Sequence, residues 1–341
     1  MKIFQNTLLL RRIVQFGFLA TILLIGVQFY LFVHQLETGA GQVISRPPGV
    51  DGFLPISSMM ALKYWLLSGT FPMVHPAGLL IFIFILITAL FLKRGFCSWV
   101  CPFGLLNDYL SKIHIWIFDK PKRVWTWLDY PLRSLKYLLL IFFAWAIWVQ
   151  MDVPSIKAFL YSPYNKVADI KMLKFFVDAT PLTIKVLNGL VLLSVLFRNF
   201  WCRYLCPYGA LLGALSWLSP WKIRRNAETC IDCKKCTKVC PMNINVHTPT
   251  TVLSDECTAC LQCVAACPVK DTLSLSAPKR RFEIRPLVYA GVIIGLFLLG
   301  SIVARIGGVW QNDIPLQDYR YFIEHLHEYD HARGQARVNH E

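Results

Sequence analysis

The feature that most constrains this chain is a pair of identically spaced cysteine runs. In each run two residues separate successive cysteines, three more precede a fourth cysteine, and proline follows; the runs are Cys230-x2-Cys233-x2-Cys236-x3-Cys240-Pro241 and Cys257-x2-Cys260-x2-Cys263-x3-Cys267-Pro268. Such a run supplies the thiolates of a [4Fe–4S] cluster. A zinc site or a set of free thiols is the alternative, but zinc sites rarely repeat this run with proline after the last cysteine. A small fold built around two clusters is therefore predicted.

The same spacing predicts how the ligands are shared. In bacterial two-cluster ferredoxins, three cysteines of one run bind one cluster and the fourth binds the other cluster. Cluster one is then predicted to be bound by Cys230, Cys233, Cys236 and Cys267. Cluster two is predicted to be bound by Cys257, Cys260, Cys263 and Cys240. Metal-binding thiols must stay reduced, which indicates the cytoplasmic side of a membrane.

Long apolar segments indicate an integral membrane protein. Of the 341 residues, 55% are hydrophobic and only 16% are charged, against about 25% charged in an ordinary soluble domain. The apolar residues gather in blocks long enough to cross a bilayer. Five spans are predicted, at Ile13–Val33, His75–Leu92, Leu135–Met151, Pro181–Phe197 and Pro286–Ala304. The first is expected to be an uncleaved anchor, because its apolar run exceeds that of a signal peptide.

The distribution of Lys and Arg predicts the orientation. With a cytoplasmic N-terminus, the inside segments 1–12, 93–136 and 198–285 hold 24 of these cations, and the outside segments hold 11. Positive residues collect on the cytoplasmic side. All twelve cysteines then face the cytoplasm of a bacterial inner membrane, and the C-terminus is periplasmic. The net charge of +15 fits this topology and membrane lipid as a partner. No nucleic-acid partner is predicted, since no readout motif is present.

A second cysteine motif, Cys-x3-Cys-Pro, occurs twice. Each copy follows a predicted outside-to-inside span and leads into an amphipathic stretch. The four thiols of this motif are Cys97, Cys101, Cys202 and Cys206. Three roles stay open: a further iron–sulfur centre shared by the two copies, a redox-active dithiol in each copy, or helix-end packing. Gly104 and Gly209 stand two residues after the prolines of these motifs, and they are expected to allow close backbone approach.

His75 is a candidate site residue at the outer mouth of the second span. A histidine there can take a proton from a quinol. The alternative is an interfacial histidine that caps the start of a helix. A surface helix is predicted at Ile56–Leu67, and three of its side chains are candidates for the same site: Lys63, Tyr64 and Trp65. Aromatic residues in such a place are more often interface anchors.

The predicted fold is an all-α integral membrane bundle of about five transmembrane helices with a small α+β diferredoxin insert. The predicted domains are a membrane domain (1–222) with four transmembrane helices and both Cys-x3-Cys-Pro motifs, a ferredoxin domain with two [4Fe–4S] clusters (223–281), a fifth transmembrane helix (282–306) and a periplasmic tail (307–341). In the tail, His327 and His331 are one helical turn apart and form a candidate metal pair; a solvated polar tail is the alternative.

Together these features resemble the NapH/NosR-type membrane polyferredoxins. The resemblance rests on Arg46-Pro47-Pro48-Gly49-Val50, His75-Pro76-Ala77-Gly78, Phe96-Cys97-Ser98-Trp99-Val100-Cys101-Pro102 and the doubled cysteine runs. It implies an electron-transfer component of a quinol dehydrogenase, which passes electrons from the quinone pool to a periplasmic reductase or other redox partner. The architecture is closer to NapH, because NosR-like members carry an N-terminal FMN-binding domain and this chain has no room for one before Ile13.

Two other functions are kept as alternatives. One is a metal (cupric) reductase or assembly factor of the CcoG type, and the other is a redox-sensing regulatory membrane protein. The sequence contains no G-x-G-x-x-G, no Walker loop and no serine nucleophile elbow, so nothing in it indicates nicotinamide, ATP or hydrolytic chemistry.

Overall fold

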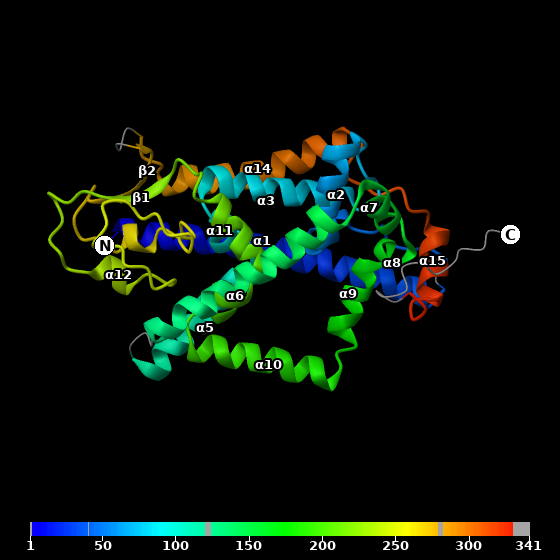
Figure 1. The fold of residues 1–341 in the computed structure, drawn as a ribbon, viewed down its shortest axis with the longest axis horizontal. Coiled ribbons are helices and arrows are strands. Elements are labelled where there is room, and N and C mark those ends of the chain that lie inside the picture. Colours follow the sequence, from blue (N-terminus) through cyan, green and yellow to red (C-terminus); the bar gives the residue numbers. More distant parts are fainter. Residues whose placement is uncertain (1, 40, 120–123, 279–281, 330–341) are drawn as a thin grey trace. The chain divides into compact units, whose positions relative to one another are not determined.

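The computed structural model describes residues 2–39, 41–119, 124–278 and 282–329. Its described elements are mostly α-helices, with one two-stranded sheet (Figure 1). The chain divides into two compact units. Unit 1 comprises Met1–Ala20, Phe84–Ile141 and Lys185–Leu298, and unit 2 comprises Thr21–Ile83, Phe142–Ile184 and Leu299–Glu341. All twelve cysteines belong to unit 1, whereas His75 belongs to unit 2.

Three of the described helices are long and apolar enough to cross a membrane. They are α1 (Lys2–Glu37), α6 (Thr126–Trp145) with the π-helical turn η2 (Ala146–Gln150), and α14 (Pro286–Ile306). A fourth span is reached if α9 (Ala168–Val177) and α10 (Pro181–Leu196), which are bent by 80°, count as one. Helix α3 (Pro76–Leu92) is a shorter apolar helix.

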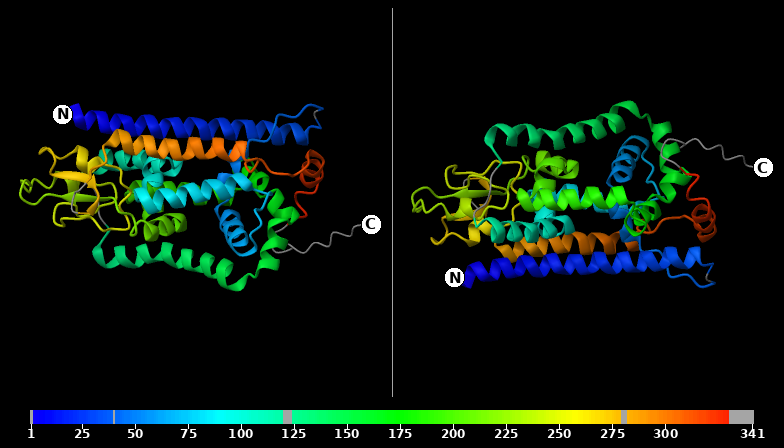
Figure 2. Two further views of the ribbon diagram at one scale, coloured as in Figure 1. Left: turned by 90° about the horizontal axis from the view of Figure 1, so that it is seen from above. Right: turned by 90° about the horizontal axis from the view of Figure 1, so that it is seen from below.

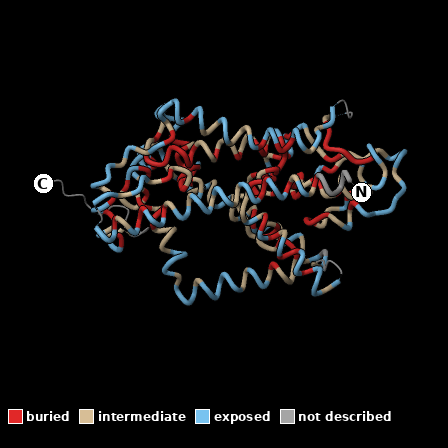
Figure 3. Tube along the Cα trace, turned by 180° about the vertical axis from the view of Figure 1, so that it is seen from behind, coloured by how far each residue is buried: buried red, intermediate tan, exposed pale blue. Residues whose placement is uncertain are grey.

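The five predicted apolar segments therefore all coincide with helices, but five spans are not confirmed. Helix α3 has 17 residues, or about 25 Å of length, slightly less than a hydrocarbon core of about 30 Å. Helix α10 has 16 residues. Its side chains are mostly exposed, as the pale tube in Figure 3 shows, and the large apolar ones include Leu182, Ile184 and Leu192. An apolar helix without protein cover is suited to contact lipid.

The core of unit 1 joins helix ends to the cysteine-rich insert. Figure 2 shows α1 and α14 side by side, and Phe18 packs edge-on against Phe297 with ring centroids 5.8 Å apart. The insert contains β1 (Lys222–Arg225) and β2 (Leu273–Ser276), which pair antiparallel with Ile223 opposite Leu275. Two single-turn helices complete it, α12 (Lys235–Lys238) and α13 (Gln262–Ala265). The predicted small α+β insert is thus present.

Short helices surround both Cys-x3-Cys-Pro motifs. The first motif lies on α4 (Gly95–Trp99) and at the start of α5 (Pro102–Phe118). The second lies on the π-helical turn η3 (Trp201–Leu205) and at the start of α11 (Pro207–Leu215). In both copies proline occupies the first turn of the following helix, where its missing N–H costs nothing and its fixed φ suits the helix.

Unit 2 is built from shorter helices around two small cores. Its elements include the 3-10 helix η1 (Pro48–Phe53), α2 (Pro55–Ser68), α7 (Val153–Leu160), α8 (Pro163–Lys166) and α15 (Leu316–Glu324). Helix α2 corresponds to the surface helix predicted at Ile56–Leu67. However, it packs against α7 through Tyr64, which is buried.

The helix in the tail ends before the candidate metal pair. Helix α15 ends at Glu324 and a turn follows, so His327 lies beyond the helix. His331 lies outside the described residues.

Candidate functional site

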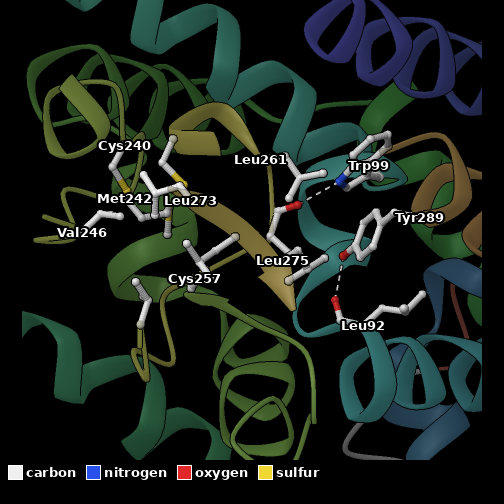
Figure 4. Close-up of a cluster of buried hydrophobic side chains, with 14 of the residues drawn as sticks. Leu92, Trp99, Cys240, Met242, Val246, Cys257, Leu261, Leu273, Leu275 and Tyr289 are labelled. Carbon is white, nitrogen blue, oxygen red and sulfur yellow. Dashed lines mark hydrogen bonds between the residues drawn. The ribbon is translucent and has the colours of Figure 1, made fainter. Parts of the chain in front are cut away.

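Two cavities in the insert are each lined by four cysteines. One is lined by Cys230, Cys233, Cys236 and Cys267. The other, here called the second cavity, is lined by Cys240, Cys257, Cys260 and Cys263. Figure 4 shows Cys240 and Cys257, from different runs, beside the same core residues. Each set contains three cysteines of one run and the fourth of the other, which is the grouping that the spacing predicts.

The two runs share one backbone conformation. The residues on either side of the second cysteine have positive φ in both runs: Asp232 (51°) and Lys234 (58°) in the first, Ala259 (49°) and Leu261 (58°) in the second. This left-handed region is uncommon for residues with a side chain. Alternation of left- and right-handed residues turns backbone N–H groups toward one point and forms an anion-binding concavity, as at many iron–sulfur sites. The matching strain indicates that both runs are shaped around similar anionic groups.

The thiols of these cavities lie close enough to affect one another. Burial and the neighbouring Cys260 and Cys257 raise the pKa of Cys240 to about 12. Burial and the first-run thiols of Cys233 and Cys230 raise the pKa of Cys267. Without a positive partner such thiols stay protonated at neutral pH, whereas iron would stabilise the thiolate forms. The donor set therefore fits two iron–sulfur clusters.

A single bound ion fits less well. Within the part of the chain that the structure describes, no group of three or more His, Cys, Asp or Glu side chains has the geometry to hold one metal ion. The cysteines of a [4Fe–4S] cluster bind different irons at the corners of a cube, so their sulfurs need not converge on one point.

The two Cys-x3-Cys-Pro motifs come together inside unit 1. Burial, then Cys97, and to a smaller extent Cys206 raise the pKa of Cys101 to about 12. Burial and the other three thiols raise the pKa of Cys202 well above its usual value. Asn107, just after the first motif, also donates its Nδ2 to Sγ of Cys202 at 3.1 Å. The four thiols thus form one group, here called the membrane-proximal thiols.

The second cysteine of each motif is the N-cap of a helix. Cys101 precedes α5 and Cys206 precedes α11. The backbone N–H of Gly209 donates to Sγ of Cys206 at 3.2 Å. Free N–H groups at a helix start, together with the helix dipole, favour negative charge on a capping sulfur. These N–H groups lower the pKa of Cys206, but burial outweighs them and leaves that pKa above its ordinary value.

The glycines after the motifs provide the expected close approach, in two different ways. A Cβ on Gly104 would lie 1.9 Å from the carbonyl oxygen of Cys97, so only glycine fits there. A Cβ on Gly209 would lie 2.8 Å from Nη2 of Arg94 and 3.5 Å from the carbonyl oxygen of Cys202. In the second copy the glycine makes room for a side chain rather than for backbone.

The segment around the first motif holds one side of the second cavity, the loop that carries Cys257 and Cys260. Nη1 of Arg94 donates to the carbonyl oxygen of Asp255 at 3.0 Å. Oγ of Ser98 donates to the carbonyl oxygen of Thr258 at 2.7 Å, and Nε1 of Trp99 donates to that of Ala259 at 3.1 Å (Figure 4). These carbonyls flank two of the cavity cysteines.

The segment around the second motif holds the other side of the cavity, at the turn after Cys240. Nδ2 of Asn199 donates to the carbonyl oxygen of Pro241 at 2.7 Å. Arg203 donates to the carbonyl oxygen of Met242 and pairs with Asp129 at 2.8 Å. Pro241 and Met242 directly follow Cys240. Both thiol motifs are therefore attached to the same cavity.

Arg94 is a site residue that the sequence analysis missed. Its side chain is buried and pairs with Glu256 at 3.2 Å. Burial alone would lower the pKa of Arg94, but Cys97 and Glu256 raise it above its ordinary value. The guanidinium thus puts a fixed positive charge beside the membrane-proximal thiols. A signal existed in the sequence, because a polar pair precedes each motif: Lys93-Arg94 and Arg198-Asn199.

His75 lies in a buried charge cluster of unit 2. Its Nδ1 is 3.0 Å from Oδ1 of Asp51, and its Nε2 is 2.7 Å from the carbonyl oxygen of Asn165. Both partners are acceptors, so both ring nitrogens donate and the ring is positively charged. Arg46 binds Asp51 and reaches Asp169 with its Nε at 2.9 Å. Two cations and two carboxylates balance, and His75 has no nitrogen available to accept a proton in this arrangement.

The electrostatics of the cluster follow from its burial. Burial alone would raise the pKa of Asp51, but Arg46 and His75 hold it below its ordinary value. Within the described residues, Oδ2 of Asp51 has no hydrogen-bond partner. The three candidate residues on α2, Lys63, Tyr64 and Trp65, make contacts elsewhere in unit 2. Nζ of Lys63, for example, donates to the carbonyl oxygens of Ile147 and Trp148 at 3.0 and 3.1 Å, at the end of η2.

Two family models match the chain. A 4Fe-4S binding domain matches residues 74–123 and 180–226, which contain both Cys-x3-Cys-Pro motifs. A 4Fe-4S dicluster domain matches residues 222–268, which contain both cysteine runs. No solved structure matches the chain.

Curated relatives of the chain have names that refer to electron transport, to ferredoxin or to regulation. The chain is 41% identical over 325 residues to the Escherichia coli protein named "Putative electron transport protein YccM", covering 94% of this chain and 91% of that protein. It is 25% identical to the ferredoxin-type protein NapH of Escherichia coli, covering 76% and 86% of the two chains. It is 27% identical to the regulatory protein NosR of Pseudomonas aeruginosa, over 50% of this chain but only 23% of that protein.

Proposed function

Because the chain belongs to the NapH/NosR-type family of membrane polyferredoxins, we propose that it relays single electrons from membrane quinol to a periplasmic redox partner. The observation that carries this proposal is the attachment of both Cys-x3-Cys-Pro motifs to the second cavity. Cysteines at the ends of apolar helices are thereby coupled rigidly to the cysteine-rich insert. A relay needs such fixed spacing, whereas a set of packing cysteines does not.

Three sets of cysteines would hold the redox groups. Cluster one takes Cys230, Cys233, Cys236 and Cys267, cluster two takes Cys240, Cys257, Cys260 and Cys263, and a third iron–sulfur centre takes Cys97, Cys101, Cys202 and Cys206. When bound, such clusters supply one-electron chemistry at potentials set by hydrogen bonds, charge and solvent exposure.

The chain's own residues prepare these sites. The side chains of Trp99, Ser98 and Asn199 donate hydrogen bonds to backbone carbonyls around the second cavity. The Arg94 guanidinium offsets negative charge at the membrane-proximal thiols. The cavity of cluster one includes Cys233, which is exposed.

Quinol oxidation also releases protons, and the proposal places their acceptor at the buried cluster of Arg46, Asp51, His75 and Asp169. His75 already carries its proton in the described arrangement. It can act as a base only after that proton has left toward Asp51, so proton uptake here requires the His75–Asp51 contact to change.

The function is tested with protein purified anaerobically and reconstituted in lipid. We expect added quinol to reduce the clusters within a single turnover, which is seen as a loss of iron–sulfur absorption. A chemical oxidant should restore that absorption. Cupric ion serves as the comparison acceptor. The relay proposal is overturned if quinol leaves the clusters oxidised while dithionite-reduced protein is rapidly reoxidised by Cu²⁺, since that pattern belongs to a cupric reductase. Clusters that quinol does not reduce and Cu²⁺ does not reoxidise would favour a sensor.

A further inference from the structure

A cavity of a different kind lies in unit 1, lined by α1, α5, Arg198 and the insert. Its volume is about 320 Å³. Asp108 is the one carboxylate among the described residues that line it, against five cations: Arg11, Arg12, Lys112, Arg198 and Lys238. The cavity therefore has a surplus of positive charge.

The single carboxylate offsets only part of this charge. Arg11 is buried and pairs with Asp108, which also accepts from Nε2 of Gln15 at 3.1 Å. Arg12 and Lys112 are exposed at the rim. Burial lowers the pKa of Lys112, and the charges of Arg12 and Arg11 lower it further. Crowded cations in a concave site attract an anion.

The position of the cavity indicates where that anion comes from. Helix α5 exposes apolar side chains at helical spacing, namely Leu106, Ile113, Trp116 and Ile117. Tyr109 belongs to the same face and also lines the cavity, and Nζ of Lys112 lies 4.4 Å from the centre of its ring. A helix with an exposed apolar face beside cations is suited to the membrane interface.

The lining is also partly apolar. Leu8, Leu105 and Ile115 line the cavity together with the cations. An inorganic anion would gain no binding energy from such apolar side chains, whereas the first carbons of an acyl chain would pack against them.

We propose that this cavity binds the phosphate of an anionic membrane phospholipid, whose acyl chains leave along the apolar face of α5. Basic pockets between membrane helices on the cytoplasmic side take lipid head groups in this way. No cysteine lines this cavity, although it shares the lining residue Pro241 with the second cavity. The proposal stands or falls independently of the relay function.

The test compares two double variants of the full chain. The double variant Arg12→Gln, Lys112→Gln removes both rim cations. Both side chains are exposed, and neither forms an ion pair with another described residue. Lys157→Gln with Lys270→Gln removes the same charge from exposed positions outside the cavity. Phosphatidylglycerol, phosphatidylcholine and inorganic phosphate are the probes, and retained lipid is counted by native mass spectrometry.

We expect wild-type protein and the control variant to retain phosphatidylglycerol but not phosphatidylcholine. The cavity variant should lose affinity by about fivefold for each cation removed, at unchanged iron content. Equal retention of phosphatidylglycerol by both variants, or equal retention of phosphatidylcholine by wild type, would overturn the proposal. Displacement of the lipid by an equal concentration of inorganic phosphate would also overturn it, because the site would then be one for the free anion.

Discussion

At the scale of single residues, the charge state of His75 can be read from its two partners. A neutral imidazole donates from one nitrogen only, yet acceptors face both nitrogens. His75→Gln should leave Asp51 and Asp169 opposed by Arg46 alone. We expect a loss of about 3 kcal/mol in unfolding free energy, the usual cost of breaking a buried ion pair, with iron content unchanged. Thermal unfolding in detergent measures it.

A second change separates a structural role of His75 from a role in proton uptake. Adding Asp51→Asn to His75→Gln restores the balance of charges, so part of the lost stability should return. If His75 takes the quinol proton, the rate of cluster reduction by quinol stays low in this double variant. Recovery of the rate together with the stability would leave His75 as a residue that only holds the start of α3.

The membrane-proximal thiols give a prediction about non-additivity. If Cys101 and Cys206 serve one shared centre, Cys101→Ser and Cys206→Ser should each remove the same extra iron, about four atoms per chain beyond the eight of clusters one and two. The double variant should then lose little more, because the residues act as a unit. Losses that simply add would indicate a separate dithiol in each motif. Unchanged iron in all three variants would make these cysteines structural.

At the scale of elements, the packing of α5 against the first motif depends on one glycine. Gly104→Ala would place its Cβ 1.9 Å from the carbonyl oxygen of Cys97, so α5 would have to move. We expect a loss of at least about 2 kcal/mol and of the iron held by the membrane-proximal thiols. Gly189→Ala in α10 is the matched control, since its Cβ meets nothing within 4 Å, and it should be neutral or slightly stabilising. Equal effects of the two substitutions would contradict the packing argument.

Elements were easier to predict from the sequence than the contacts between them. Apolar length and cysteine spacing are local properties, so all five apolar segments and the grouping of the eight run cysteines could be anticipated. The 80° bend between α9 and α10 could not be anticipated, because an apolar run does not reveal where the helix axis changes direction. The buried Arg46–Asp169 pair could not be predicted either, because the two residues are far apart in sequence and meet only in the folded chain.

At the scale of the whole chain, the distribution of charge predicts the orientation in the membrane. The 24-to-11 division of Lys and Arg predicts a cytoplasmic insert and a periplasmic C-terminus. An alkaline phosphatase fused after Glu341 should therefore be active, and the same reporter inserted after Ala227, in the exposed start of the insert, should be inactive. The reverse pattern would overturn the orientation and, with it, the assignment of the quinol side.

The crossed cysteine sets also have a consequence for how the protein is made. With the proposed ligands, the second cavity needs Cys240 from the first run, and the first cavity needs Cys267 from the second. A nascent chain that has emerged only as far as the first run contains neither of these two sites complete, however long synthesis pauses there. Insertion of these two clusters must wait until the second run has left the ribosome. Translation itself thus sets the earliest moment of maturation, and a message truncated between the runs should yield protein without either cluster.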